Sequence, residues 1–402
     1  MLRTFFISIL LASGISAAAQ QTFVHGADAS WASEMEADGM KFYNDNGQAT
    51  DIFQLMSDIG MTAVRLRVWV NPSVFGYGAW CDKADVVRKA RRAHDKGLDL
   101  MIDFHYSDFF ADPAKQNIPT DWKGYDMAQL KDAVRSHTTD VLQALKDEGI
   151  TPRWVQVGNE TNGGMLWNAG KIDWNKTGSN RYAAYVELHN TGYDAVKAIF
   201  RDAYVILHLA DGYKAGDWDG WFFADFKNAG GKFDMIGLSH YPDYNQWSSK
   251  AAGTASNYNV ANSVETLGKT FGVPVMICET GFRQSDAARA KRVMQDLMER
   301  LKASAHCAGV FYWEPETDGK WKPQYYYKVN WNAYDMGAFS EGRPTVALDA
   351  FRKNTQTAIE IVSVPADSYA GDEYIYNLQG QRMKSAPQHG VYIKNGKKII
   401  QK

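Results

Sequence analysis

Two glutamates, Glu160 and Glu279, stand in short polar segments that each follow an apolar, strand-like run of the chain. Two carboxyl groups that face each other across a cleft can hydrolyse a glycosidic bond, with one as nucleophile and the other as acid and then as base. We predict that Glu279 is the nucleophile and that Glu160 is the proton donor. The negative charge of Glu279 and partial burial should raise the pKa of Glu160 and keep it protonated before the attack.

Other polar side chains come at the ends of neighbouring apolar runs. Asn159 precedes Glu160 and suits a hydrogen bond to the sugar 2-hydroxyl, which tightens as the ring gains positive charge. Arg65 and Tyr241 are predicted to keep Glu279 ionised and aligned through charge-assisted hydrogen bonds.

Three histidines and a tryptophan complete the set of candidate residues. His105, His208 and His240 offer donors to substrate hydroxyls or to the acids, and Trp313 is expected to floor the cleavage position. The alternative that the histidines are neutral residues satisfied by their neighbours stays open. A zinc site is disfavoured because the nearby acids are already committed to sugar chemistry.

The elements that must position these residues alternate along the chain. Eight short apolar, β-branched runs recur, each followed by a longer stretch with helical apolar spacing, which is typical of a parallel sheet. We predict an α/β fold, a (β/α)8 TIM barrel over residues 20–355, in which working residues lie at the carboxyl ends of the strands. The predicted strands are Phe23–Ala27, Ala63–Val70, Leu98–Tyr106, Trp154–Val157, Tyr204–Leu209, Phe233–Ser239, Pro274–Cys278 and Gly309–Trp313, and helices are predicted at Ala84–Lys96 and Met127–Glu148, with Gly97 and Gly149 as C-caps.

Residues 356–402 differ in character and predict a small C-terminal β module. Alternating apolar residues occur in Ile359–Val362 and Glu373–Tyr376, a further strand is predicted at Val391–Ile393, and Asn395-Gly396 is a hairpin signal. Whether this module merely packs on the barrel or serves secretion or surface retention stays open.

Composition and the N-terminus limit the function classes. A formal charge of −2, from 44 basic and 46 acidic residues, offers no single-sign field for nucleic acid. Residues 1–19, with Arg3, an apolar stretch and Ala17–Ala19, are typical of a signal peptide. No later run is long and apolar enough for a transmembrane segment. We therefore expect a secreted protein, periplasmic or extracellular, and a monomer. Three cysteines without short spacing predict no disulfide framework.

Longer strings around these residues resemble glycoside hydrolase family 53, the endo-β-1,4-galactanases, within the retaining (β/α)8 clan. They cover most of residues 23–350, in the family's order: Gly26-Ala27-Asp28, Val64-Arg65-Leu66-Arg67-Val68-Trp69-Val70-Asn71-Pro72, Asp103-Phe104-His105-Tyr106-Ser107-Asp108, Ala111-Asp112-Pro113-Ala114-Lys115-Gln116, Gln156-Val157-Gly158-Asn159-Glu160-Thr161-Asn162-Gly163, Glu279-Thr280-Gly281 and Phe311-Tyr312-Trp313-Glu314-Pro315. The resemblance implies endo-hydrolysis of β-1,4-galactan, the side chain of pectic type I arabinogalactan, to galacto-oligosaccharides. It also implies Glu160 as proton donor, Glu279 as nucleophile, and Trp167, Asp108 and His208 as further contacts with the substrate.

One departure from the family concerns metals. Some members follow the strand-seven glutamate with an acidic loop that holds calcium, whereas Gly281–Asp286 runs quickly into a predicted helix and offers no ladder of acidic ligands. We predict no metal and no cofactor. The aromatic-rich segment Glu316–Ala338 could shape remote sugar positions or close one end of the cleft.

Two alternative functions remain at this point. The same mechanism would serve a cellulase, mannanase or xylanase, because composition and spacing do not identify galactose. A barrel that has lost catalysis and only binds carbohydrate is the second alternative, disfavoured because both glutamates are present.

Overall fold

The computed structural model describes residues 22–214, 220–242 and 254–352, and in the C-terminal part residues 375–377, 382–383, 385, 387, 390–394 and 397–401. The chain divides into two compact units, Met1–Asn354 and Thr355–Lys402. The predicted signal peptide and the predicted strand Ile359–Val362 lie outside the described residues.

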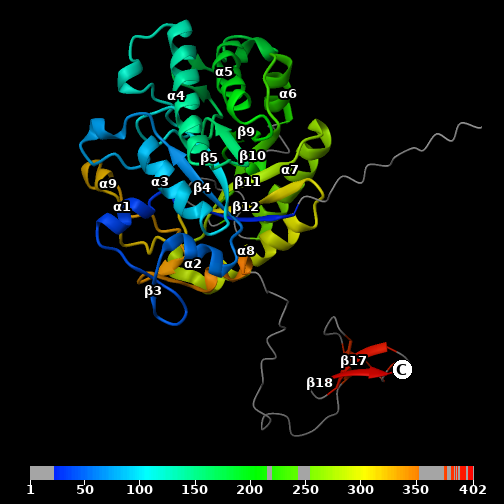
Figure 1. The fold of residues 1–402 in the computed structure, drawn as a ribbon. Coiled ribbons are helices and arrows are strands. Elements are labelled where there is room, and N and C mark those ends of the chain that lie inside the picture. Colours follow the sequence, from blue (N-terminus) through cyan, green and yellow to red (C-terminus); the bar gives the residue numbers. More distant parts are fainter. Residues whose placement is uncertain are drawn as a thin grey trace, which may run out of the picture. The chain divides into compact units, whose positions relative to one another are not determined.

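Among the described residues, eight parallel strands close into a barrel (Figure 1). Their order around the barrel is β1-β12-β11-β10-β9-β6-β5-β4. The predicted (β/α)8 barrel is confirmed, and the strand bounds either match the predicted ones or differ from them by one or two residues. The strands are β1 (Val24–Asp28), β4 (Ala63–Val68), β5 (Asp99–Phe104), β6 (Trp154–Val157), β9 (Tyr204–Leu209), β10 (Met235–Ser239), β11 (Val275–Thr280) and β12 (Cys307–Trp313).

Helices follow the strands and cover the outside of the barrel (Figure 1). The capping box of α4 shows how the sequence sets a helix start, because Asp126 accepts from the backbone of Gln129 and the Gln129 side chain accepts in return. The two predicted C-cap glycines, Gly97 and Gly149, have φ of 71° and 72°. The helices are α1 (Ala32–Ala37), α2 (Ile52–Ile59), α3 (Lys83–His94), α4 (Met127–Asp147), α5 (Ala183–Ile199), α6 (Gly220–Asn228), α7 (Thr254–Phe271), α8 (Ala287–Lys302), α9 (Gln324–Lys328) and a closing 3-10 helix (Val346–Phe351).

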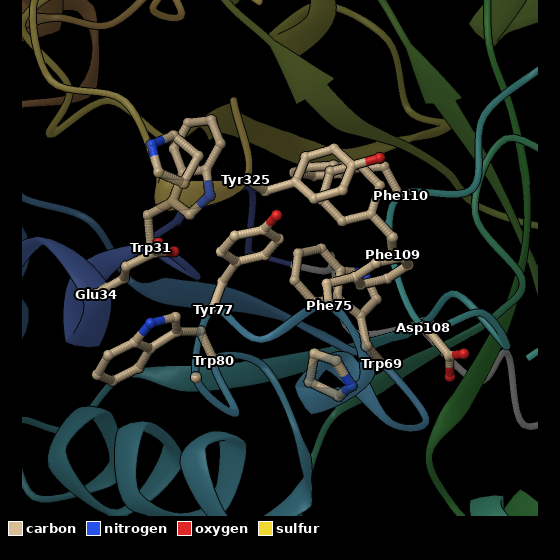
Figure 2. A pocket seen from close by; sticks show the side chains of 13 residues that line it. Trp31, Glu34, Trp69, Phe75, Tyr77, Trp80, Asp108, Phe109, Phe110 and Tyr325 are labelled. Atoms are coloured by element: carbon tan, nitrogen blue, oxygen red, sulfur yellow. The ribbon is translucent and has the colours of Figure 1, made fainter. Parts of the chain in front are cut away.

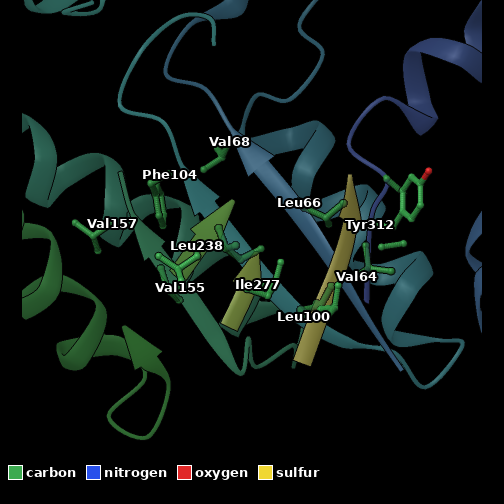
Figure 3. Packing of buried hydrophobic residues seen from close by; sticks show 14 of the residues in the cluster. Val64, Leu66, Val68, Leu100, Phe104, Val155, Val157, Leu238, Ile277 and Tyr312 are labelled. Atoms are coloured by element: carbon green, nitrogen blue, oxygen red, sulfur yellow. The ribbon is translucent and has the colours of Figure 1, made fainter. Parts of the chain in front are cut away.

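Strand β4 shows how the barrel strands divide their side chains between two layers. Val64, Leu66 and Val68 pack outward in the layer between strands and helices (Figure 3), which is the main core. Ala63 belongs to the cluster that fills the barrel interior. Because side chains alternate along a strand, Arg65 and Arg67 point inward with Ala63. Two arginine side chains therefore point into the barrel from a strand whose other residues are all apolar.

Strand β11 carries an extra residue relative to both neighbours. Leu238 pairs with Ile277 and Ser239 with Glu279, so one step on β10 corresponds to two on β11, and the pairing with β12 shifts in the same stretch. Cys278 belongs to the interior cluster, so simple alternation would turn Glu279 outward. A bulge of this kind re-aims a side chain, and it lets Glu279 turn inward.

Smaller strands complete the two units. β15, β16, β17 and β18 form a four-stranded antiparallel sheet in the order β16-β15-β17-β18. The predicted strands at Glu373–Tyr376 and Val391–Ile393 correspond to β15 and β17, and the predicted hairpin residues Asn395-Gly396 lie outside the described residues. The bounds are β2 (Phe42–Tyr43) with β3 (Ala49–Thr50), β7 (Gly164–Met165) with β8 (Gly170–Lys171), β13 (Phe339–Ser340) with β14 (Arg343–Pro344), and β15 (Ile375–Tyr376), β16 (Arg382–Met383), β17 (Gly390–Lys394) and β18 (Lys397–Gln401).

Candidate active site

Arg65 is the centre of the polar network at the carboxyl end of the barrel. Its side chain is fully buried and donates to Asp28, Asp103 and Gln156 at 2.7, 2.8 and 2.7 Å. Burial alone would lower the pKa of Arg65, but the surrounding carboxylates outweigh it and raise this pKa well above its ordinary value. Arg65 is therefore a permanent positive charge inside the barrel mouth.

Glu279 is held by two donors. Arg65 Nη2 lies 2.9 Å from Oε1, and the Tyr241 hydroxyl donates to Oε2 at 2.9 Å. Burial raises the pKa of Glu279 to about 7, while Arg65 and the Tyr241 hydroxyl both oppose the rise. Both carboxylate oxygens are thus fixed in direction, as a nucleophile requires, and the structure brings Arg65 and Tyr241 to Glu279 as the sequence predicted.

Glu160 follows β6 on a strained backbone, with φ of 46°. Burial first, and then the charge of Glu279, raise its pKa well above the ordinary value, whereas the Ser239 hydroxyl works in the other direction. Arg65 and Tyr241 hold the charge of Glu279, so a proton shared by the two glutamates resides on Glu160. This is the protonation state that an acid catalyst needs.

His208 is linked to Glu160 by hydrogen bonds. The ring is fully buried, and Nδ1 accepts from Gln156 Nε2 at 2.9 Å and from the Glu160 backbone N–H at 3.3 Å. Asn159 Oδ1 also lies 3.1 Å from Nδ1, but this oxygen already accepts from Arg65 Nη2. We therefore assign the His208 proton to Nε2, which donates to the Ser239 hydroxyl at 3.0 Å and leaves that hydroxyl free to donate to Glu160. Burial lowers the pKa of His208 well below its ordinary value, so the ring is neutral.

Asn159 is oriented from both sides. Its Oδ1 accepts from Arg65 Nη2 at 2.8 Å, and its Nδ2 donates to the Ala111 carbonyl at 2.8 Å. Because an amide NH2 has two hydrogens, one remains for a ligand. His105 holds the same loop, since its Nδ1 accepts from the Ala111 N–H at 2.9 Å and its Nε2 lies 2.9 Å from Asp103. Both nitrogens of His105 thus have protein partners.

Trp313 stands half-buried at the end of β12, next to a second buried arginine. Its ring contacts Trp31 at 5.1 Å and Tyr334 at 4.6 Å between centroids. The Arg67 guanidinium pairs with Glu314 and lies over four rings, those of Trp31, Trp69, Phe110 and Trp313, at 4.8 to 5.9 Å. These contacts fix the orientation of the Trp313 indole at the barrel mouth.

An aromatic pocket lies beside this floor, among the loops after β1, β4, β5 and β12 (Figure 2). Asp108 is one of its walls, but its carboxylate already accepts from the N–H groups of Asn71 and Thr120 at 3.0 and 2.7 Å. Burial raises the pKa of Glu34, another wall, to about 7. The other lining residues are Trp31, Trp69, Pro72, Phe75, Tyr77, Gly78, Trp80, Phe109, Phe110, Pro323 and Tyr325.

Two further predicted contacts have side chains whose partners lie outside the hydrogen bonds of Arg65. Trp167 is half-buried in the turn between β7 and β8, where its Nε1 donates to the Gly163 carbonyl at 2.9 Å. His240 points outward to α7, because its Nε2 lies 2.9 Å from Asn257 Oδ1. The geometry assigns supporting positions to His105, His208 and His240, and substrate contact by these and by Asp108 and Trp167 stays a prediction.

Sequence reasoning missed several members of the network. Asp28, Asp103, Gln156 and Ser239 bind Arg65 or His208 directly, yet they were not chosen as site residues. Their signal was present, because each is a polar residue within or at the end of an otherwise apolar barrel strand. Gln116 was also missed, and its Nε2 donates to the carbonyls of Asn159 and Glu160 at 2.8 and 3.3 Å.

In the described ranges, no three His, Cys, Asp or Glu side chains gather as metal ligands. No helix in the described part of the chain has both the length and the apolarity to cross a bilayer. Cys81, Cys278 and Cys307 are all buried free thiols.

Known proteins resemble this chain over the barrel. The family model described as Glycosyl hydrolase family 53 matches residues 24–351. The Bacillus subtilis endo-beta-1,4-galactanase is 31% identical over 324 residues, 73% of this chain and 70% of that protein. The Cellvibrio japonicus arabinogalactan endo-beta-1,4-galactanase is 33% identical over 320 residues, 73% of this chain and 80% of that one. Among solved structures, the Ignisphaera aggregans GH53 catalytic domain is 26% identical with a TM-score of 0.70, covering 84% of this chain and 97% of its own.

Proposed function

The chain belongs to glycosyl hydrolase family 53, and from this premise we propose that it cleaves β-1,4-galactan inside the polymer with retention of configuration. Glu279 is the nucleophile and Glu160 the acid and base. The observation that carries the proposal is the difference between the surroundings of the two carboxyl groups. Arg65 and Tyr241 hold Glu279, whereas within the described part of the chain Glu160 forms no ion pair. Environments that push two pKa values apart mark an acid and a nucleophile.

In the first step, Glu279 attacks the anomeric carbon and the bond to the leaving oxygen breaks. The leaving oxygen takes the proton of Glu160, and a covalent glycosyl ester forms on Glu279. The loss of the Glu279 charge removes one of the causes that raise the pKa of Glu160. In the second step Glu160 therefore accepts a proton from water, which attacks the ester and frees the sugar with its original configuration.

The surrounding residues stabilise the positive charge that develops on the sugar ring. The remaining hydrogen of Asn159 Nδ2 serves the 2-hydroxyl, and the bond tightens in the transition state because Arg65 and Ala111 fix the amide. Trp313 lies under the ring. Arabinogalactan endo-beta-1,4-galactanase is the activity named for the Cellvibrio japonicus relative, and it supports galactan of type I arabinogalactan as the substrate here, with galacto-oligosaccharides as products.

Export belongs to the same proposal. The signal-like residues 1–19 support secretion to the periplasm or the exterior, where a pectic polymer can be reached. Cleavage of this segment is tested by N-terminal sequencing of protein recovered outside the cytoplasm. An intact Met1 on the exported protein would contradict it.

The activity is tested with linear β-1,4-galactan, comparing the wild type with Glu160→Ala and Glu279→Ala. Each variant should lose about 10³-fold or more of kcat, because each group supplies a covalent or a proton-transfer step. Proton NMR of the first product anomer tests retention, and azide should restore turnover to Glu279→Ala as an inverted glycosyl azide. Intact galactan beside cleaved mannan, xylan or cellulose would overturn the substrate and keep the mechanism.

A further inference from the structure

Two tryptophans outside the candidate active site expose much of their side chains. Trp174 is 52% exposed in the segment between β8 and α5, and Trp221 is 39% exposed in the first turn of α6. Their ring centroids lie 5.9 Å apart at an interplanar angle of 75°. Large exposed apolar surfaces that gather in one place mark binding sites, because leaving them in water is unfavourable.

Both tryptophans lie on the catalytic side of the barrel. Trp174 belongs to the connection that follows β6, and Trp221 to the connection that follows β9. Connections of this type start at the carboxyl ends of the strands, which is where Glu160 and Glu279 stand. The strands β6 and β9 are neighbours, so the two tryptophans occupy one sector of this face.

The segment that carries Trp174 is tied to the loop that carries Glu160. The Ile172 N–H donates to the Gly163 carbonyl at 3.0 Å, three residues beyond Glu160. The Asp173 N–H then donates to the Arg181 carbonyl at 3.1 Å, and the Arg181 guanidinium lies 5.6 Å from the centre of the Trp174 ring. The exposed Trp174 indole is therefore held in place relative to Glu160. Because the side chain is already ordered, little conformational entropy is lost when a ligand binds to it.

A second set of exposed aromatic rings comes from the connection that follows β12. Tyr327 is 60% exposed and Trp331 is 39% exposed. The Trp331 ring lies 6.1 Å from the ring of Phe109 and 5.5 Å from Lys115 Nζ, and both of these residues follow β5. Because β5, β6 and β9 are neighbouring strands, exposed tryptophans lie near the connections that follow all three.

We propose that Trp174 and Trp221 form a distal carbohydrate-binding position that holds the galactan chain several sugar units from the bond being cleaved. The inference rests on the proposed galactanase activity. A β-galactose ring presents a C–H face that packs on an indole, and its hydroxyls suit the donors of Arg181, whose guanidinium lies beside the Trp174 ring. The position contributes affinity for long chains and none of the chemistry.

The observations favour a saccharide over a protein partner. Two tryptophan rings offer far less area than the roughly 1,000 Å² that a stable protein interface requires. Their place beside the catalytic loop fits a polymer that already occupies the mouth, since each further sugar then binds without a new association cost.

The test compares wild type, Trp174→Ala, Trp221→Ala and the double variant on two substrates. One is long linear galactan, measured both by retardation in galactan-containing native gels and by kcat/KM. The other is 4-nitrophenyl β-1,4-galactobioside, which is too short to reach the distal position. The matched control is Tyr258→Ala on α7, because this exposed tyrosine is also stacked by an arginine, Arg300, at 5.8 Å.

We expect the double variant to bind galactan roughly tenfold more weakly, because truncating a ring that anchors a ligand costs on the order of 1 kcal/mol or more. The bioside kinetics and the Tyr258→Ala control should stay at the wild-type level. An equal loss on both substrates, or no change in galactan binding, would overturn the distal position. A wild type that neither binds nor cleaves galactan would overturn the proposed function as well.

Discussion

Arg65 Nη2 lies 2.9 Å from Glu279 Oε1, and the same nitrogen donates to Asn159 at 2.8 Å. One guanidinium thus positions the nucleophile on β11 and the residue that precedes the acid on β6. The forked shape of the group is what allows this, because its five donors point in fixed directions.

Replacing Arg65 by Lys keeps the charge and loses the fork. A single ammonium cannot serve Asp28, Asp103, Gln156, Asn159 and Glu279 together, so kcat/KM should fall about 10²- to 10³-fold. Arg65 lowers the pKa of Glu279, and Glu279 must be ionised to act. The acidic limb of the pH profile of kcat/KM should therefore move to higher pH in Arg65→Lys. Arg92→Lys, which loses a similar fork toward Glu36 and Asp51 on the outside of the barrel, is the control. An unchanged acidic limb in Arg65→Lys would contradict the assignment.

Tyr241→Phe removes the hydroxyl that donates to Glu279 Oε2 and leaves the ring. This hydroxyl lowers the pKa of Glu279, so its loss should also shift the acidic limb upward, and kcat should fall roughly tenfold because a bond to a charged group is lost. The pH dependence of kcat/KM on galactan measures both effects. Loss of kcat without any shift of the limb would argue that Tyr241 acts on the substrate instead.

His189→Leu should stabilise the protein. His189 is fully buried on α5, and neither ring nitrogen has a hydrogen-bond partner among the described residues. Burial lowers its pKa to about 3. The unfolded chain, with a histidine pKa near 6.5, therefore binds more protons as pH falls below 6.5, and stability is lost progressively toward pH 3.

Leu at position 189 has no such loss, so the gain in melting temperature over wild type should be larger at pH 5 than at pH 8. The exposed His94, changed to Leu in the same way, supplies the comparison. A His189→Leu variant that melts lower than wild type at both pH values would show that the histidine is satisfied in solution.

Lys89→Met tests a buried ion pair. The Lys89 side chain is fully buried, lies 2.7 Å from Asp85 Oδ2 and donates to the Ser30 carbonyl at 2.6 Å. Its removal takes the fully buried cation from Asp85 Oδ2 and leaves only Arg88, which is 53% exposed, on Oδ1. The loss should cost about 3 kcal/mol of unfolding free energy. Lys83→Met breaks the exposed pair with Asp140 and should cost roughly 1 kcal/mol or less. Denaturant unfolding of both variants gives the comparison, and equal losses would refute the role of burial.

The alternation of apolar runs along the chain was enough to predict eight strands in a closed barrel and to place Glu160 and Glu279 at strand ends. It also predicted the two partners of Glu279, because Arg65 is a polar residue within the predicted strand Ala63–Val70 and Tyr241 follows the predicted strand Phe233–Ser239. Local sequence signals also predicted where helices end, as Gly149, which follows the end of α4, illustrates.

Only the tertiary structure decided which way each side chain turns. Plain alternation from Cys278 directs Glu279 out of the barrel, and one extra residue in β11 reverses that direction. The sequence of a strand that is apolar on both faces does not show such a bulge, because an extra residue does not disturb any apolar–polar alternation. His240 likewise meets Asn257 on α7 rather than the barrel mouth. Contacts of this kind join residues distant in sequence through barrel closure and helix packing, whereas a sequence pattern reports only the periodicity of its own segment.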